Sequence, residues 1–184
     1  MSNVRHLDYD EPVLGYHRIV AAQVAAVAPV GGRVADLGCG PGQVLAELRR
    51  LRPDLKLVAV DDDPQCLRLA EARTATAEPV RADITQVTDD LIGRPDVIVS
   101  CHSLEHLPDP VGALGQWSRL LSAEGRLVVA VPNAHQPLML ARSLFRRPKA
   151  NEGHYYIWDR ATFDTFCRLT GMAVEARSVD YVPL

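Results

Sequence analysis

The sequence VADLGCGPGQV, from Val34 to Val44, is the most informative stretch of this chain. An apolar run leads into three glycines, Gly38, Gly40 and Gly42, and a helical pattern follows them. Glycine allows tight turns and lets a ligand lie directly against backbone N–H groups at the start of a helix. The stretch therefore predicts a strand, a turn and a helix that together hold a nucleoside cofactor.

Short apolar runs and longer helical patterns alternate on both sides of this turn. Strands are expected at Arg33–Leu37, Lys56–Val60, Pro79–Ala82, Asp96–Ser100, Arg126–Val131 and Met172–Val179. Helices are expected at Glu11–Ala28, Gly42–Leu51, Pro64–Thr74, Pro110–Leu121 and Ala161–Leu169. This alternation predicts an α/β fold, a Rossmann-like doubly wound parallel sheet covered by helices on both faces.

The composition is that of an ordinary globular protein. The chain has 184 residues, of which 47% are hydrophobic and 23% are charged, and its net charge is −3. A nucleic-acid-binding protein would be expected to carry a strongly basic face, which the sequence lacks. The four cysteines form no CxxC pair, and no apolar run approaches the roughly 18 residues of a membrane span. We therefore expect a cytoplasmic protein that binds neither nucleic acid nor membranes.

We expect a single domain over residues 1–184, in which two segments flank the ligand site. Residues 1–30 are expected to form an N-terminal cap helix, in which Tyr16 packs near the cofactor site. Residues 133–158 follow the carboxyl end of a strand and are rich in Pro, Asn and Gly, which predicts a substrate lid with a short helix at Leu138–Phe145. The aromatic residues Tyr155, Tyr156 and Trp158 are expected to anchor that lid.

Carboxylates lie at the ends of three of the expected strands, on the same side of the sheet as the glycine turn, and the first of them is Asp36, inside the end of Arg33–Leu37. Asp61 ends the second strand, where it is placed to accept hydrogen bonds from both ribose hydroxyls. Asp83 follows the third strand and is suited to accept from an adenine amine, with the backbone N–H of Ile84 beside it. Asp62 extends the acidic run, and this charge disfavours the 2′-phosphate of NADP. Asp63, directly before Pro64, is expected to be a helix N-cap.

These motifs resemble the class I S-adenosylmethionine-dependent methyltransferases that act on small molecules. The resemblance rests on VADLGCGPG, VAVDDDP, RADI, DVIVSCHSLEHLPDP and GRLVVAVPN, in that order, from Val34 to Asn133. It implies the strand order 3-2-1-4-5-(7)-6, with the last antiparallel strand missing, and an enzyme that converts S-adenosylmethionine to S-adenosylhomocysteine. The residues expected to bind the cofactor are Asp36, Gly38, Cys39, Gly40, Gly42, Asp61, Asp62, Asp83, Ile84, Ser100 and Cys101.

Three histidines are candidates for chemistry on the methyl acceptor, since an imidazole titrates near neutral pH. His102 comes first after the fourth strand and is expected to face the transferred methyl group. His154 lies where similar methyltransferases carry a histidine, and His106 is expected to fix its loop by a hydrogen bond. We expect O-methylation of a small molecule by in-line displacement, with His102 or His154 as base. Nitrogen and carbon acceptors stay open, and His6, His17 and His135 are expected on the surface.

Three other interpretations are weighed against this one. His102 to His106 spell HxxEH, the inverted zinc-peptidase signature, but Pro108 and Pro110 interrupt the helix that the signature needs, so we expect no metal site. A nicotinamide oxidoreductase would share the sheet, but Gln43 occupies the position of its third fingerprint glycine. A non-catalytic nucleoside-binding scaffold would keep the glycine turn and lack an acceptor pocket.

The expected strand Met172–Val179 is followed by only five residues. The family's last strand therefore has no counterpart, and an open sheet edge invites pairing with another chain. This predicts either a homodimer through the sheet edge or a sixth strand directly beside the fifth.

Overall fold

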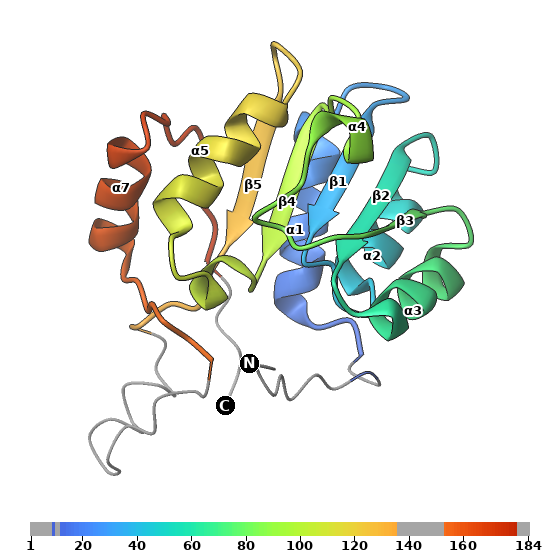
Figure 1. Ribbon diagram of the computed structural model, residues 1–184, viewed down its shortest axis with the longest axis horizontal. Helices are drawn as coiled ribbons and strands as arrows, with labels where there is room; N and C mark the ends of the chain where they lie inside the picture. The colour runs from blue at the N-terminus through green and yellow to red at the C-terminus, as the bar shows by residue number, and fades with distance from the viewer. Residues whose placement is uncertain (1–8, 10–11, 136–152, 180–184) are drawn as a thin grey trace.

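The computed structural model describes residue 9, residues 12–135 and residues 153–179 (Figure 1). Its strands are β1 (Arg33–Leu37), β2 (Lys56–Asp61), β3 (Glu78–Arg81), β4 (Val97–Cys101) and β5 (Arg126–Ala130). Its helices are α1 (Gly15–Val27), α2 (Gln43–Leu51), α3 (Pro64–Thr74), α4 (Asp89–Ile92), α5 (Pro110–Leu120) and α7 (Arg160–Leu169), with a 3-10 turn η1 at Leu104–His106. Strands and helices alternate along the chain, as the sequence predicts.

The five strands form one parallel sheet in the order β3-β2-β1-β4-β5. This is the first part of the order that the resemblance implies. The order reverses between β1 and β4, and Asp36 of β1 lies opposite Val99 of β4 and Ala59 of β2. In open α/β sheets, ligands bind beyond the carboxyl ends of the strands at such a reversal.

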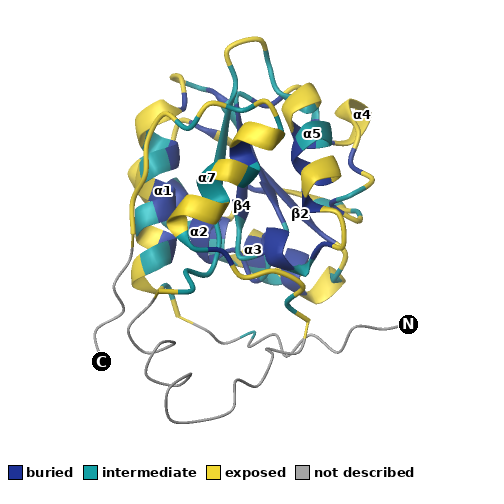
Figure 2. Ribbon diagram, turned by 90° about the vertical axis from the view of Figure 1, so that its left-hand side faces the viewer, coloured by how far each residue is buried: buried dark blue, intermediate teal, exposed yellow. Residues whose placement is uncertain are grey.

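Helices cover both faces of the sheet, and each face has its own apolar core (Figures 1 and 2). Helices α1, α2 and α3 pack on one face, where Val24, Leu45 and Ala70 are fully buried. Helices α4, α5 and α7 cover the other face, where Trp117 is the largest fully buried side chain. The central strands are therefore buried on both sides, which explains their nearly continuous apolar sequences.

The predicted helix starts are confirmed where proline follows aspartate. Asp63 accepts a hydrogen bond from the Gln65 N–H at 2.8 Å, and Asp109 accepts one from the Gly112 N–H at 2.9 Å. Each aspartate caps a helix whose first residue is proline, which lacks an N–H that would need a partner. Both helices therefore begin at a defined residue.

Two predictions about element boundaries are wrong. Residues 172–179 form no strand, and Arg126 of β5 reaches this segment through its side chain, with its Nε 3.0 Å from the Glu175 carboxylate. Helix α1 begins at Gly15, not at Glu11. Its N-terminus is capped at Leu14, whose N–H donates to the His17 side chain at 3.0 Å. The expected lid helix at Leu138–Phe145 lies outside the described residues. None of the helices that the structure describes is both long and apolar enough to cross a membrane.

Candidate functional site

The connections that carry the residues singled out by the sequence lie beyond the carboxyl ends of the strands, at the same end of the sheet (Figure 1). The glycine turn follows β1, Asp61 ends β2, and Asp83 follows β3. The histidine-containing turn η1 follows β4. Because all five strands are parallel, these connections meet around the switch between β1 and β4.

The glycine turn is held in place by the neighbouring strand. The N–H groups of Gly38 and Cys39 both donate to the Val60 carbonyl, at 2.8 and 3.0 Å. Gly38, Gly40 and Gly42 all have positive φ, at 77°, 52° and 85°, which other residues rarely adopt. The turn therefore depends on glycine at each of these positions.

The three glycines face different surroundings. A Cβ at Gly38 would collide with the Ser103 side chain, and one at Gly42 would lie 2.6 Å from the Ala70 Cα in α3. A Cβ at Gly40 would meet no atom of the described residues within 4 Å. Gly38 and Gly42 thus allow close packing within the protein, whereas Gly40 leaves bare backbone facing open space, where a ligand can approach.

Asp61 links β2 to the glycine turn. It is almost fully buried, its Oδ2 accepts the Gly40 N–H at 2.9 Å, and its Oδ1 accepts the Asp63 N–H at 3.0 Å. Each carboxylate oxygen can accept a further hydrogen bond. The carboxylate is therefore fixed beside Gly40 at the end of β2.

Asp36 is a buried carboxyl group near the carboxyl end of β1, the central strand of the sheet. Only 1% of it is exposed, and neither side-chain oxygen has a hydrogen-bond partner among the described residues. Burial, followed by the charge of Asp61, raises the pKa of Asp36 to about 7. A buried polar group without a partner is costly, so this pair of oxygens suits a polar or cationic ligand.

The other expected cofactor residues lie around the same edge with different exposure. Asp83 is exposed and caps a turn by accepting from the N–H and hydroxyl of Thr85, at 2.8 and 2.7 Å. Ile84 is buried, and its carbonyl accepts the Trp117 Nε1–H at 2.8 Å. Asp62 is exposed. Of the remaining three, Cys39 and Ser100 are buried and Cys101 is half-buried.

His102 lies directly after β4 in a left-handed backbone conformation, with φ 56°. Its Nδ1 lies 3.2 Å from Oε1 of Glu105, and its ring packs edge-on against Tyr16 of α1 at 4.7 Å between ring centroids. Positive φ is uncommon outside glycine and clusters at functional sites. The side chain is partly exposed.

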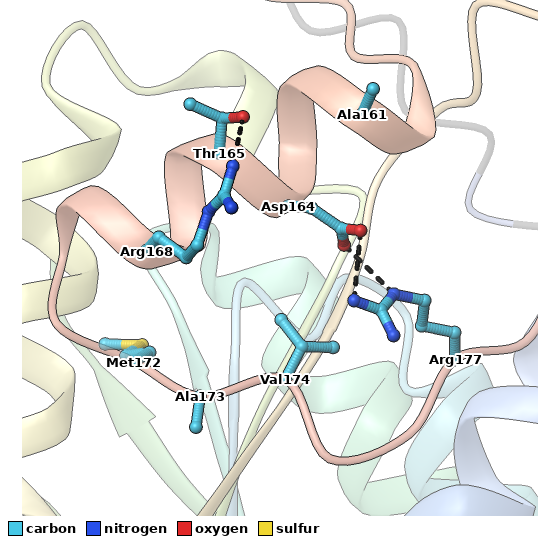
Figure 3. Close-up of a pocket in the computed structure, with 8 residues that line it drawn as sticks. All are labelled: Ala161, Asp164, Thr165, Arg168, Met172, Ala173, Val174 and Arg177. Atoms are coloured by element: carbon cyan, nitrogen blue, oxygen red, sulfur yellow. Dashed lines mark hydrogen bonds and ion pairs between the residues drawn. The ribbon is translucent and has the colours of Figure 1, made fainter.

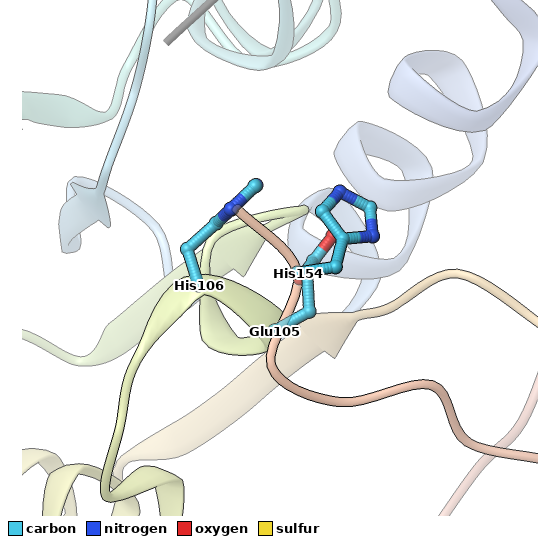
Figure 4. A group of neighbouring side chains, drawn as sticks. All are labelled: Glu105, His106 and His154. Carbon is cyan, nitrogen blue, oxygen red and sulfur yellow. The ribbon is translucent and has the colours of Figure 1, made fainter. Parts of the chain in front are cut away.

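His106 and His154 lie together, although they are far apart in the sequence (Figure 4). Their ring centroids are 4.6 Å apart, and Nδ1 of His106 lies 2.8 Å from the Gly153 carbonyl. That hydrogen bond has the loop-fixing role expected for His106. The pKa of His154 is lowered, first by burial and then by the charge of His106.

Two residues of this region are not found by sequence reasoning. Glu105 is fully buried, although an acidic residue in a loop is ordinarily exposed. His17, expected on the surface, is buried against Tyr16, with 4.0 Å between the ring centroids. Burial lowers the pKa of His17 to about 4. In the sequence, the only signal for His17 is its position on the apolar side of a helix.

The geometry of η1 also shows whether the HxxEH signature forms the helix that a zinc peptidase needs. That signature needs both histidines on one helix face. Here Leu104–His106 forms a single 3-10 turn, and His102 lies outside it with a left-handed backbone. The helical zinc-peptidase arrangement is therefore not formed.

Of the three aromatic residues expected to anchor a lid, Tyr156 and Trp158 pack against the protein. Trp158 is buried against Phe163 and Phe166 of α7, with ring centroids 5.6 and 5.4 Å apart. Tyr156 stacks on Trp158 and donates its hydroxyl to the Pro108 carbonyl at 3.0 Å. Tyr155, in contrast, is 59% exposed.

A separate pocket of about 510 Å³ lies between α7 and residues 172–177 (Figure 3). An ion pair between Asp164 and Arg177 crosses it, with Nη2 and Oδ2 3.0 Å apart. Arg168 donates to the Thr165 hydroxyl at 2.9 Å. None of the expected site residues lines this pocket, and each of its three charged side chains has a partner within it.

Comparison with known proteins assigns the sequence pattern to a family. A family model described as a methyltransferase domain matches residues 14–176. The ubiquinone biosynthesis O-methyltransferase of Xanthomonas axonopodis pv. citri is 28% identical, over 70% of this chain and 56% of that protein. The trans-aconitate 2-methyltransferase of Methylobacterium radiotolerans is 34% identical, over 61% of this chain and 44% of that protein. The chain thus spans about half the length of these relatives.

A solved structure agrees with the fold. The plantazolicin methyltransferase, determined in complex with S-adenosylhomocysteine, superimposes with a TM-score of 0.63. It is 19% identical, and the match covers 84% of this chain and 62% of that chain. At this identity the comparison supports the architecture of the sheet and its helices.

Proposed function

The chain belongs to the class I S-adenosylmethionine-dependent methyltransferases, and we propose that it methylates an oxygen atom of a small molecule with His102 as the general base. The observation that carries this proposal is the open backbone of Gly40 beside the buried carboxylates Asp36 and Asp61. A bare backbone and two acidic groups suit a nucleoside that carries positive charge.

The chain's own residues fit the cofactor of this family. Gly40 would let the cofactor lie against the main chain, and Asp61 would accept hydrogen bonds from its ribose. The unpartnered oxygens of Asp36 would face its positive charge, and Asp83 and Ile84 would lie near the adenine. When bound, S-adenosylmethionine supplies a sulfonium methyl group that is already activated for displacement.

The protein then has to align the acceptor, exclude water and remove a proton. Alignment of reacting atoms at about 3 Å supplies much of the acceleration of such a reaction. His102 would accept the proton of an acceptor hydroxyl at Nε2, because its Nδ1 faces the buried carboxylate of Glu105. Oε1 of Glu105 has no hydrogen-bond partner among the described residues, so the carboxylate would act on the ring through its charge, which favours the tautomer with Nδ1–H and leaves Nε2 to take a proton.

An oxygen acceptor is supported by the relatives. The relative from Xanthomonas is named as an O-methyltransferase of ubiquinone biosynthesis, a pathway of small molecules. The proposed imidazole base suits such an acceptor, because a hydroxyl loses its proton on methylation. His154 lies on the same side of the sheet edge and is the second candidate for the base.

The experiment combines cofactor binding with turnover. Calorimetric titration should give one binding event with S-adenosylhomocysteine and none with NADH. Incubation with S-adenosylmethionine and a panel of phenols and carboxylic acids should yield a product heavier by one CH₂ unit.

His102→Gln tests the base, with His135→Gln as the matched control at an exposed histidine. The first change should lower turnover by roughly 10²–10⁴-fold, the usual contribution of a general base, with unchanged S-adenosylhomocysteine affinity. Equal turnover in both variants would show that His102 is not the general base. Binding of NADH in place of S-adenosylhomocysteine would overturn the whole assignment.

A further inference from the structure

Glu105 has a buried carboxylate that the protein leaves largely unsatisfied. The residue is 0% exposed, and neither Oε1 nor Oε2 has a hydrogen-bond partner among the described residues. The His102 ring lies beside it, with Nδ1 3.2 Å from Oε1. A buried carboxylate is stable only when it is paired with a cation or well hydrogen-bonded. Oε2 therefore needs a further positive partner.

Two imidazoles lie beside this carboxylate. One ligand atom from each of Glu105, His106 and His154 can be chosen so that all three lie within 4.8 Å of one another. In the view of Figure 4, the visible carboxylate oxygen of Glu105 lies beside the His154 ring. The ring planes are nearly perpendicular, at 85°, so the two histidines do not stack face to face.

The backbone holds these groups together before any ligand binds. The Tyr155 N–H donates to the Glu105 carbonyl at 2.8 Å, which ties the segment of His154 to η1. Nδ1 of His106 lies 2.8 Å from the Gly153 carbonyl. A histidine that donates one ring N–H to a backbone carbonyl presents its other nitrogen as a ligand, the usual arrangement around protein-bound metals.

We propose that Glu105, His106 and His154 bind one divalent transition-metal ion, of which Zn²⁺ is the representative. Two imidazole nitrogens and one carboxylate oxygen are a ligand set that such ions prefer. This site differs from the HxxEH signature, because His154 replaces His102 as a ligand and the site needs no continuous helix.

Three protein ligands leave coordination positions for an outside oxygen. The ion would lie near His102 at the carboxyl end of β4 and could bind an acceptor oxygen. That use of the ion rests on the proposed function, whereas the site itself does not.

The test uses the untagged full chain, freed of metal by chelation and dialysis. Calorimetric titration with Zn²⁺ alone should show one ion bound per chain. Co²⁺ alone should give visible absorption bands typical of nitrogen and oxygen ligands. Bound ion should also raise the melting temperature, since it binds only the folded chain.

His154→Ala should weaken Zn²⁺ binding at least about tenfold. Glu105→Gln should do the same, and His135→Ala should leave binding unchanged because His135 lies outside the cluster. His154 is only half-buried, so its variant keeps the test valid if Glu105→Gln fails to fold. Absence of Zn²⁺ binding, or equal binding by wild type and His154→Ala, would overturn the site.

S-adenosylhomocysteine binding is measured on the same samples. If that binding is retained while Zn²⁺ does not bind, the metal site fails and the proposed function stands. If Zn²⁺ binds and S-adenosylhomocysteine does not, the proposed function fails and the metal site stands.

Discussion

Substitutions at Gly40 and Gly42 of the glycine turn should have different effects, because only Gly40 faces open space. Gly40 and Gly42 both have positive φ, so alanine at either position carries backbone strain of about 1 kcal/mol. They differ in their surroundings, since only Gly42 packs against another helix, through Ala70 of α3. The two positions therefore separate the loss of ligand binding from the loss of packing.

Gly40→Ala should leave a folded protein with strongly reduced affinity for S-adenosylhomocysteine, because the added methyl group enters the space where a ligand would lie. Gly42→Ala should lower the free energy of unfolding by a further 1–3 kcal/mol or so, since its Cβ would lie 2.6 Å from Ala70. Urea unfolding and calorimetry measure the two quantities. A Gly40→Ala protein with wild-type affinity would contradict the open-backbone argument.

Asp36 should make the stability of the ligand-free protein depend on pH. Its pKa rises from 3.8 to about 7 on folding, so the folded state favours the protonated form. The contribution of protonated Asp36 to the free energy of unfolding is complete below about pH 4 and is lost as the pH rises through about 7. It amounts to roughly 4 kcal/mol at most, since one pKa unit corresponds to about 1.4 kcal/mol.

Asp36→Asn removes the titrating group and keeps the shape. Urea unfolding at a series of pH values should show a smaller loss of stability for this variant than for the wild type between about pH 5 and pH 8. Parallel curves for the two proteins would show that Asp36 does not titrate in this range.

Single side chains differ in how far the sequence reveals them. The spacing of Gly38, Gly40 and Gly42 and the Asp-Pro pairs could be interpreted directly, because each acts through the local backbone. Glu105 and His17 could not, because their burial depends on which distant segments cover them. Gly153 and Tyr155 reach η1 from about fifty residues further along the chain.

Helix α7 and the segment before it act as one packed element. Trp158 is buried between its neighbours and contacts Phe163 and Phe166, while the N-cap Asp159 accepts the Thr162 N–H at 2.8 Å. The Trp158 carbonyl also accepts the Ala134 N–H at 2.9 Å. This tryptophan therefore connects the chain after β5 to α7.

Trp158→Ala should reduce the free energy of unfolding by about 3–5 kcal/mol, the usual cost of removing a buried tryptophan. Tyr155→Ala is the control, because Tyr155 is 59% exposed and its loss should cost under about 0.5 kcal/mol. Chemical denaturation of both variants provides the measurement. Equal stability of the two would show that Trp158 does not anchor the segment.

Residues 172–179 show where local pattern fails to predict an element. Their alternation of apolar and polar residues is typical of a strand, yet most of them are exposed and they join no strand ladder. A strand forms only when a neighbouring strand pairs with its main-chain groups. Here the segment contacts β5 through side chains, with Arg126 donating to the Glu175 carboxylate. Sequence pattern predicts the central strands better because both of their neighbours are present.

The molecule as described has a sheet with two unequal edges. Strand β3 ends one edge and contains Pro79, which cannot donate a main-chain hydrogen bond. Strand β5 ends the other edge and pairs only with β4 among the described residues. The β5 edge is therefore the one at which a second copy would pair.

We expect a reversible dimer through β5, and sedimentation velocity over a range of concentrations measures it. Hydrogen exchange should show the β5 amides better protected at high concentration than at low concentration, because pairing would occupy them. The β3 amides are the internal control and should not change. A monomer at every concentration would contradict this prediction.

The bridge between Asn133 and Trp158 brings together the two ends of a long excursion of the chain. Because its ends meet at the sheet edge, whatever sequence runs between them can lengthen, shorten or be exchanged without straining the strands. Under the proposed function, in which residues 133–158 form the substrate lid, acceptor preference would follow this one segment while the cofactor side stays constant. Grafting the corresponding insert from a relative would be a direct route to altering which compound is modified.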